Sequence, residues 1–228
     1  MECMGSLIAP LFSADAIAVE GSVSLVDDQI LPEEWEYIQG AAPKRRAEFG
    51  TARVFARRAL AALGVAPEPL LPGVDRAPLW PSGITGSVTH TSDYCAVVAR
   101  RSPPCRSVGL DAEEVRPLDD FIVRLVSTPT ERRWLSGRPG QARDVLTLLL
   151  FSAKEAYYKL QYRITGRMLD FQDVEVDIRL AAGSFEARTA AEGVPPDLTS
   201  VTGRFRYAAG KVLCGVELPC DPTRELDR

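Results

Sequence analysis

Two long helical patterns, one in each half of the chain, limit the folds that this sequence can adopt. The first runs from about Pro43 to Leu63, with proline suited to the first helical position and Gly64 to the position just after the end. The second and stronger pattern runs from about Val145 to Tyr162 and precedes Gly166. Because strand patterns accompany each helix, the chain is predicted to be α+β.

Short strand patterns follow the first helix and flank the second. The expected strands are Val88–His90, Tyr94–Arg100, Val108–Glu113, Phe171–Ile178 and a hairpin of Phe205–Tyr207 with Lys211–Leu218. The first three are predicted to form a meander, after a proline-rich loop over residues 65–83. Two shorter helices are expected, one over Leu118–Val126 and one opening at the capping-box pattern of residues 128–131.

The two halves predict two similar lobes that meet near residues 100–115. A chain of 228 residues has room for one large domain or two small ones. We set the lobes at residues 1–106 and 107–228 and expect them to form one compact unit.

Composition excludes several classes of protein. With 27 Lys and Arg against 31 Asp and Glu, the net charge is −4, so duplex nucleic-acid binding is not expected as the main role. No stretch approaches the ~20 apolar residues that span a bilayer. The first 21 residues carry three acids and no Lys or Arg, unlike a signal or transit peptide. The five cysteines are scattered without a Cys-x-x-Cys motif, which indicates reduced thiols in a cytoplasmic protein.

Two carboxylates, Asp111 and Glu113, end an apolar strand pattern. Alternation along a strand gives both side chains the same face. Oxygen ligands of this kind suit Mg²⁺, which keeps some waters and takes further ligands from substrate phosphates. The alternative is a solvated strand edge running into a polar turn, and the pair alone does not decide between the two.

A third carboxylate, Glu155, lies at the border of the apolar stripe of the second long helix, with Lys154 and Lys159 beside it. Glu155 and Lys159 are four residues apart and share one helix face. The pattern suits a surface ion pair worth ~0.3–0.5 kcal/mol. It equally suits a metal-binding or base carboxylate flanked by two phosphate-binding ammonium groups, because a carboxylate at a core border has a tunable pKa.

His90 is the only histidine, which excludes a site built from several histidines. It is either structural, beside an apolar strand, or a donor to an anion with help from Thr89. A basic run opens the first long helix and comprises Lys44, Arg45, Arg46, Arg53, Arg57 and Arg58. A solvated helix face and a phosphate clamp both fit that run. Acids, cations and one histidine together suit metal-assisted handling of a pyrophosphate group.

Three segments in this order resemble the 4′-phosphopantetheinyl transferases, in particular the single-chain, surfactin-synthetase-activating type and its subgroup like enterobactin synthase component D. The segments are Trp80–His90, Val108–Glu113 and Phe151–Lys159, preceded by Lys44–Phe49 and Arg53. The resemblance covers about residues 40–180, and three motifs in order are far more specific than one.

The resemblance implies transfer of the 4′-phosphopantetheine arm of coenzyme A to a serine of an apo carrier protein, with release of adenosine 3′,5′-bisphosphate. The carrier would be an acyl, peptidyl or aryl carrier of fatty acid, polyketide, nonribosomal peptide or siderophore biosynthesis. The implied fold is a monomer of two α+β lobes related by a pseudo-twofold axis, with the active site in the cleft between them.

The resemblance also assigns roles to the candidate residues. Asp111, Glu113 and Glu155 would bind Mg²⁺, or Mn²⁺ in its place, and Glu155 would deprotonate the carrier serine directly or through water. Lys154 and Lys159 would hold the pyrophosphate, and Lys159 would act beside Glu155 in catalysis. The coenzyme A contacts would further include His90 and Arg45 at the 3′-phosphate, Arg53 and Thr89 nearby, and Arg76 in a loop close to the adenine.

Two other functions fit the same residues, namely a metal-dependent hydrolase of nucleotide pyrophosphates and a coenzyme A-binding protein without catalysis. The transferase interpretation adds a carrier surface. The segment Leu118–Leu135 is rich in apolar side chains, including Phe121 and Leu125. We expect part of it to form the rim on which the carrier's helix docks, through hydrophobic anchors and not charge pairing, because the net charge of −4 gives little attraction to an acidic carrier.

Overall fold

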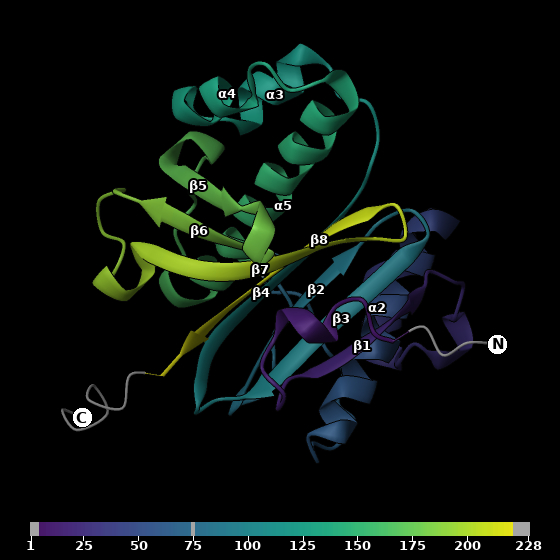
Figure 1. Cartoon of the computed structure of the whole chain (residues 1–228). Coiled ribbons are helices and arrows are strands. Elements are labelled where there is room, and N and C mark those ends of the chain that lie inside the picture. The colour runs from purple at the N-terminus through teal and green to yellow at the C-terminus, as the bar shows by residue number, and fades with distance from the viewer. Residues whose placement is uncertain (1–4, 74–75, 221–228) are drawn as a thin grey trace. The chain divides into compact units, whose positions relative to one another are not determined.

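The computed structural model describes residues 5–73 and 76–220 (Figure 1). The helices are α1 (Pro32–Ile38), α2 (Pro43–Ala62), α3 (Asp120–Val126), α4 (Pro129–Leu135) and α5 (Gly140–Thr165), with short 3₁₀ turns at Ala9–Leu11, Asp27–Gln29, Phe171–Asp173, Leu180–Ala182 and Pro196–Leu198. The strands are β1 (Ile17–Ser22), β2 (Ile84–His90), β3 (Tyr94–Arg101), β4 (Cys105–Glu114), β5 (Val174–Arg179), β6 (Ser184–Thr189), β7 (Ser200–Ala208) and β8 (Lys211–Pro219). The predicted α+β class is confirmed.

The described residues form two compact units. One contains Ala14–Val108 together with residues 217–220, and the other contains Gly109–Val216 together with residues 5–13. The change between the units after Val108 lies close to the boundary set from the sequence after residue 106, but each end of the chain joins the unit built mainly from the other half. Over the described ranges, no helix combines the length and the apolar character needed to cross a bilayer.

In the first of these units, α2 covers one face of a three-stranded sheet. The strand order is β1-β3-β2, and both pairings are antiparallel. Phe55 and Ala56 of α2 pack with Cys95 and Val97 of β3 in the core of this unit. The helix begins at Pro43, as predicted, because proline has no amide hydrogen to leave unsatisfied in the first turn.

The predicted meander of three consecutive strands is wrong. The second edge of β3 is occupied by β1, in a register that runs from Ile17 opposite Ala99 to Ser22 opposite Tyr94. β4 lies instead beside β8 in a five-stranded sheet. β1 escaped prediction because its residues up to Gly21 are all half-buried, so the strand lacks the alternation of buried and exposed positions that marks a strand in a sequence.

In the other unit, α5 lies against β5, β6 and β7 of the five-stranded sheet, whose order is β4-β8-β7-β6-β5 (Figure 1). The helix begins five residues before the predicted start, at Gly140, because its first turn is polar and carries little apolar pattern. Gly166 ends it with a left-handed φ of +64°. α3 and α4 pack beside α5, and α4 has the predicted capping box between Thr128 and Glu131.

Candidate active site

β4 carries the first two candidate carboxylates. Asp111 is buried at 4% exposure, and Glu113 is half-buried. Ala112 lies between them and points to the opposite face of the strand, where it is also buried. Both carboxyl groups therefore share one face of β4, with Asp111 shielded from water and Glu113 partly so.

Gly109 allows α5 to reach this part of β4. A Cβ atom at position 109 would lie 1.9 Å from the carbonyl oxygen of Ala156, far inside van der Waals contact. The two backbones therefore touch at a point two residues before Asp111 on the strand and one residue after Glu155 on the helix. Only glycine fits this crossing, and it brings the carboxylate-bearing segments of β4 and α5 together.

The three carboxyl groups influence one another electrostatically. Burial raises the pKa of Glu113 to about 7, and the negative charges of Asp111 and Glu155 add to this effect. Burial also raises the pKa of Glu155, again with help from Asp111. Lys159 opposes both shifts. The region thus concentrates more negative charge than its neighbouring cations balance.

Lys159 is the cation that meets this group. Its Nζ donates to Asp111 Oδ1 at 2.7 Å and to the carbonyl oxygen of Leu110 at 3.0 Å. The side chain is 28% exposed, so solvent reaches it. Because an ammonium group has three hydrogens, Lys159 has one more to donate beyond these two bonds.

The donor set fits Mg²⁺, although the side chains are not yet gathered around a point. Among the residues described, no three His, Cys, Asp or Glu side chains converge closely enough to hold a metal ion as they stand. Asp111, Glu113 and Glu155 supply hard carboxylate oxygens, which Mg²⁺ prefers. Burial raises the pKa of Glu113 most, and a divalent cation would relieve the repulsion from Asp111 and Glu155 that adds to it.

Lys154 lies in a different environment from the pyrophosphate role expected of it. Its Nζ donates to Glu131 Oε2 at 2.7 Å and to the carbonyl oxygens of Val126 and Phe171, both at 2.8 Å. These three bonds use all three hydrogens of an ammonium group that is 2% exposed. Lys154 therefore has no hydrogen left to donate to a phosphate in this structure.

Glu131 is the centre of this buried network, a role that the sequence did not predict. Its carboxylate accepts hydrogen bonds from the amides of Thr128 and Val176, each at 2.7 Å, as well as from Lys154. The network joins α4, α5 and β5 within one unit. The capping-box pattern signalled the bond to Thr128, but nothing local in the sequence signalled the bonds to α5 and β5.

In the other unit, Arg53 on α2 is a buried cation at 5% exposure. Its Nε is buried with no hydrogen-bond partner among the described residues, and its guanidinium lies over the ring of Phe49, 4.1 Å from the centroid. Burial, with smaller contributions from Arg45 and Arg57, lowers the pKa of Arg53 to about 10. A buried guanidinium without a carboxylate partner is well suited to receive an anion.

Arg57 lies one turn further along α2 and is paired. Its Nη1 donates to both oxygens of Glu34, at 2.7 Å and 2.5 Å, and Glu34 is fully buried. Glu34 also accepts from the amides of Leu31 and Leu70. Of these two arginines, Arg57 is held by a buried carboxylate, whereas Nε of Arg53 has no hydrogen-bond partner among the described residues.

His90 and Arg53 both lie close to Cys95. His90 is opposite Cys95 in the antiparallel pair of β2 and β3, and such partners share a face of the sheet, here the face that α2 covers. Burial raises the pKa of Cys95 to about 12, and the positive charge of Arg53 opposes this shift. The exposed His90 is therefore at the end of the strand beside the helix that carries Arg53.

The remaining coenzyme A candidates differ in their surroundings. Thr89 is buried, and its side chain faces away from α2, opposite to His90, because neighbouring residues of a strand alternate between faces. Arg45 is 53% exposed and lies 3.7 Å from Glu48. Arg76 is exposed, with φ +68°, in a loop closed by a hydrogen bond from its amide to Gly73. Val74 and Asp75 of that loop lie outside the described residues.

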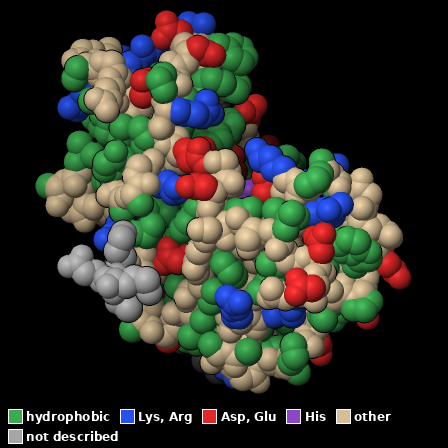
Figure 2. Space-filling model, turned by 90° about the vertical axis from the view of Figure 1, so that its right-hand side faces the viewer, with side chains coloured by type: hydrophobic (Ala, Val, Ile, Leu, Met, Phe, Trp, Pro, Cys, Tyr) green, Lys and Arg blue, Asp and Glu red, His purple; other side chains and the backbone are tan. Residues whose placement is uncertain are grey.

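Acidic and basic side chains are interspersed over the face of the molecule in Figure 2, and no single sign of charge covers that face. This pattern agrees with the small net charge of −4. Any recognition of charged ligands on this face therefore depends on local groups.

Comparison with known proteins identifies the family. Residues 33–100 match the 4′-phosphopantetheinyl transferase N-terminal domain, and residues 107–209 match the 4′-phosphopantetheinyl transferase superfamily. The chain is 40% identical over 212 residues to 4′-phosphopantetheinyl transferase Svp of Streptomyces mobaraensis, covering 91% of this chain and 86% of that protein. It is 36% identical over 226 residues to 4′-phosphopantetheinyl transferase PptT of Mycobacterium tuberculosis, covering 94% and 99%.

A more distant similarity reaches Enterobactin synthase component D of Escherichia coli, 32% identical over 142 residues, or 59% of this chain and 64% of that protein. The superfamily match over residues 107–209 includes the segments that carry Asp111, Glu113, Glu155 and Lys159. On the extent of the matches and their identity, the chain belongs to the 4′-phosphopantetheinyl transferase superfamily.

Proposed function

We propose that this protein transfers the 4′-phosphopantetheine group of coenzyme A to a serine of an apo carrier protein, in a reaction that requires Mg²⁺ and releases adenosine 3′,5′-bisphosphate. The observation that carries the proposal is the group formed by Asp111, Glu113 and Glu155 around Lys159, on two elements whose backbones touch at Gly109. Three carboxylates that repel one another and share a single lysine favour the binding of a further cation.

Asp111, Glu113 and Glu155 would hold the metal ion. Bound there, Mg²⁺ would neutralise charge on the pyrophosphate and orient it for attack. Lys159 would donate its remaining hydrogen to the same phosphates, and it would gain a further donor if Asp111 turned to the metal ion.

The proposed chemical step is a displacement at phosphorus. The serine hydroxyl oxygen of the carrier forms a bond to the phosphorus of the pantetheine phosphate, and the phosphoanhydride bond to adenosine 3′,5′-bisphosphate breaks. Glu155 takes the serine proton, directly or through water, and its raised pKa makes it a better base than an ordinary carboxylate. The electron pair of the broken bond leaves with the bisphosphate.

Arg53 would receive the 3′-phosphate of coenzyme A, with His90 and Arg45. The support is that Arg53 is buried without a partner at Nε and lies beside the same residue, Cys95, as His90. A dianionic phosphate would supply the charge-assisted hydrogen bonds that this guanidinium lacks. We leave Lys154 out of the ligand contacts, and Thr89 would act through its backbone or by supporting β2.

The test is intact-mass analysis of apo carrier proteins after incubation with coenzyme A, Mg²⁺ and the enzyme. We expect the carrier mass to rise by one phosphopantetheine group, and the increase to disappear with a metal chelator or with Glu155→Gln. Coenzyme A cleavage in the absence of carrier would support a pyrophosphate hydrolase instead. Binding of coenzyme A without turnover under every condition would support a non-catalytic protein.

The proposed function also implies a class of protein substrate, an oligomeric state and a cellular compartment. We propose acyl, peptidyl or aryl carriers as the protein substrates, an enzyme active as a monomer, and action in the cytoplasm. Cys95, Cys105 and Cys214 are free thiols, which suits a reducing compartment. Light scattering of the purified protein would test the monomer, and a second copy needed for activity would contradict it.

A further inference from the structure

Glu34 is a fully buried carboxylate outside the candidate site, and it joins three segments of the chain. Its oxygens accept hydrogen bonds from the amide of Leu31 at the start of α1, at 3.1 Å, and from the amide of Leu70, at 3.0 Å. The third partner is Arg57 of α2, whose Nη1 lies 2.7 Å and 2.5 Å from the two oxygens. One side chain therefore holds α1, α2 and the loop of Leu70 together, within the unit that contains Ala14–Val108.

The bond to Leu70 matters because the surrounding loop is rich in proline. Pro67, Pro69 and Pro72 have no amide hydrogen, so this stretch of backbone has few donors that can bind it to the rest of the unit. The amide of Leu70 is one of them, and its acceptor is the carboxylate of Glu34. Loss of that acceptor would leave a buried amide unsatisfied.

Leu70 begins a short hairpin, described over residues 70–73 and 76–80 and called the 70–80 hairpin below. Its two sides are joined by a hydrogen bond of 2.9 Å from the amide of Leu79 to the carbonyl oxygen of Leu71. Both ends are buried, at 1% exposure for Leu70 and 9% for Trp80, and both pack in the core of the unit. The hairpin is thus anchored at its two ends, whereas its middle is more exposed.

Trp80 holds the second end of the hairpin against β2. A Cβ atom at Gly86 would lie 2.5 Å from the ring of Trp80, so the ring lies directly on the backbone of the strand. β2 continues from Gly86 to His90, a candidate residue for the 3′-phosphate. The hairpin therefore runs from the Glu34 network to the strand that carries His90.

Two candidate coenzyme A residues are linked to Glu34. Arg76 lies in the hairpin with φ +68°, a left-handed conformation that residues other than glycine seldom adopt. Such a conformation persists only where the surrounding structure holds it. Arg53 lies on α2, one turn before Arg57, and burial lowers its pKa to about 10, with the negative charge of Glu34 as the largest opposing contribution. Glu34 thus connects the hairpin of Arg76 with the helix of Arg53.

We propose that Glu34 is a positioning residue for coenzyme A, which acts through Arg57 and the amide of Leu70 to hold the 70–80 hairpin in the conformation that contacts the nucleotide. The inference rests on the proposed function, since it concerns how the nucleotide end of coenzyme A is received by α2 and β2. Because the hairpin is fixed before the ligand arrives, binding does not have to order it, and preorganisation of this kind increases affinity. Glu34 is fully buried, so it acts through these partners and not by contact with the ligand.

Two double variants isolate the acceptor of the Leu70 amide. In E34M/R57M, apolar side chains replace the buried ion pair, a change that often leaves stability intact, and the amide of Leu70 loses its acceptor. In E34Q/R57M, the same two charges are removed, but the carbonyl oxygen of the glutamine side chain still accepts from that amide. The two proteins therefore have equal charge and differ in the hydrogen bond to the hairpin.

The probe is adenosine 3′,5′-bisphosphate, titrated by calorimetry without carrier protein or turnover. We expect E34M/R57M to bind it about ten-fold more weakly than E34Q/R57M, which binds it as the wild type does, because only the first variant leaves the amide of Leu70 unsatisfied. In transfer assays, the KM for coenzyme A is expected to rise by the same factor in E34M/R57M, while kcat at saturating coenzyme A is unchanged. Hydrogen exchange at the amide of Leu79 is expected to be faster in E34M/R57M alone.

An ester at position 70 provides an independent variant. Incorporation of the α-hydroxy analogue of leucine at Leu70 removes the N–H and leaves the ion pair of Glu34 and Arg57 in place. We expect the same loss of affinity for the bisphosphate as in E34M/R57M. If E34M/R57M does not fold, the ester variant decides the question, and normal affinity in it would overturn the proposal.

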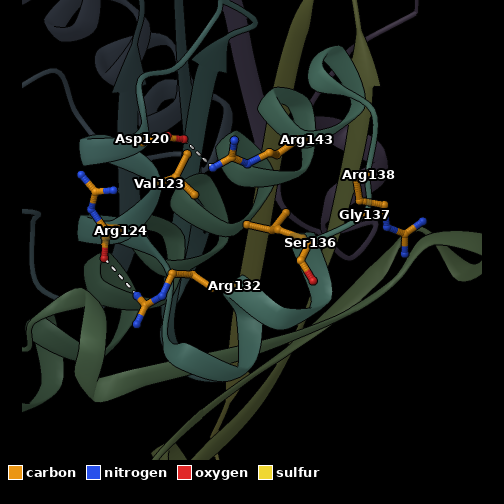
Figure 3. Close-up of a pocket in the computed structure, with 9 residues that line it drawn as sticks. Asp120, Val123, Arg124, Arg132, Ser136, Gly137, Arg138 and Arg143 are labelled. Atoms are coloured by element: carbon orange, nitrogen blue, oxygen red, sulfur yellow. Dashed lines mark hydrogen bonds and ion pairs between the residues drawn. The ribbon is translucent and has the colours of Figure 1, made fainter.

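The other unit contains a cavity of about 420 Å³ that offers a second place for an anionic nucleotide (Figure 3). Four of its lining residues are arginines, namely Arg124, Arg132, Arg138 and Arg143. Their guanidinium groups do not converge on one point in Figure 3, and Arg143 is paired with Asp120 at 2.7 Å. The control variant R124Q/R138Q is therefore expected to bind the bisphosphate as the wild type does. Loss of bisphosphate binding in this control would place the nucleotide in the cavity and overturn the proposal.

Equal affinity of the two double variants for the bisphosphate would show that Glu34 has a structural role only. The result is separable from that of the proposed function, because the titration needs no transfer. A wild-type protein that binds the bisphosphate in this Glu34-dependent way but never modifies a carrier would keep the positioning role and remove the transferase. A protein that transfers normally, with the KM for coenzyme A unchanged in E34M/R57M, would do the reverse.

Discussion

Lys154 Nζ lies 2.7 Å from Glu131 Oε2 in a pair whose two side chains are each 2% exposed. Lys159, five residues further along α5, is 28% exposed and pairs with Asp111 at the same distance. The two lysines are therefore similar in chemistry and opposite in role. Lys154 ties α4, β5 and α5 together, whereas Lys159 belongs to the candidate site.

Substituting each lysine tests whether Lys154 stabilises the fold and Lys159 does not. Lys154→Met is expected to destabilise the fold by about 3–5 kcal/mol, because it leaves Glu131 as an uncompensated buried charge. Lys159→Met is expected to cost only about 1 kcal/mol, because water reaches that pair. Urea denaturation measures both effects.

In functional assays, we expect Lys159→Met to be the more damaging of the two variants. Lys159→Met is expected to remain folded and to lose transfer, whereas Lys154→Met, assayed at a temperature where it is folded, is expected to keep its affinity for coenzyme A. A stable Lys154→Met protein with a lowered coenzyme A affinity would instead return Lys154 to the ligand contacts.

The α2 arginines form a second matched pair. Arg53→Met is expected to weaken coenzyme A binding by about 10- to 100-fold, since a charge-assisted hydrogen bond contributes about 1.5–3 kcal/mol. The effect on 3′-dephospho-coenzyme A should be much smaller. Arg57→Met is expected to destabilise the protein by about 3–5 kcal/mol through the unpaired Glu34. Equal losses of the two ligands with Arg53→Met would contradict the 3′-phosphate assignment.

The raised pKa of Glu113 should make the stability of the metal-free protein depend on pH. Its pKa is about 7 in the fold, against an ordinary value of 4.5, so the folded state binds more protons than the unfolded state between these pH values. Stability should therefore fall as pH rises from about 4.5 to 7. At pH 8 and without metal, Glu113→Gln is expected to be about 1–2 kcal/mol more stable than the wild type, a value below the full linkage because solvent screens the half-buried group.

Mg²⁺ is expected to make the wild type more stable than Glu113→Gln at pH 8. Binding of Mg²⁺ to the folded state stabilises the wild type by RT ln(1 + [Mg²⁺]/Kd) and so raises its melting temperature, and the effect is expected to be lost in Glu113→Gln. Thermal melts of both proteins at pH 5.5 and pH 8, with and without Mg²⁺, provide the measurement. A Glu113→Gln protein that gains as much from Mg²⁺ as the wild type would remove Glu113 from the proposed metal site.

Thiol reactivity tests the burial of the cysteines. Burial raises the pKa of Cys95 to about 12 and that of Cys105 to about 11, so neither forms appreciable thiolate at pH 8. We expect both to react with a disulfide reagent only after denaturation, whereas the partly exposed Cys220 reacts in the native protein. Mass mapping of the modified peptides distinguishes them, and rapid native labelling of Cys95 would contradict the packing of α2 on β3.

Local chemistry made much of this structure predictable. Pro43 and Gly166 mark one end each of the two long helices, and the capping box of Thr128 and Glu131 opens α4, because these signals act within a few residues. The side chains that share a face of β4 followed in the same way from strand alternation. Family resemblance supplied the roles that spacing alone left open.

Long-range partnerships were not predictable from such signals. Lys154 and Glu131 are separated by 23 residues, and β1 meets β3 across most of the first half of the chain. Both pairings depend on tertiary packing, which no local pattern encodes. Thr89 shows that adjacency in a motif does not predict a shared site. The motif groups it with His90, but neighbouring residues of β2 point to opposite faces of the strand.

The absence of a side chain at Gly109 has a consequence for redesign. Because the strand and the helix are already in contact there, the spacing of the two backbone segments behind Asp111 and Glu155 is at its lower limit. Exchanging carboxylates for longer or shorter ones would change the size of an ion's cage, but it could not draw these segments closer. Transplanting the three acids to another scaffold would accordingly require a glycine crossing as well as the acids themselves.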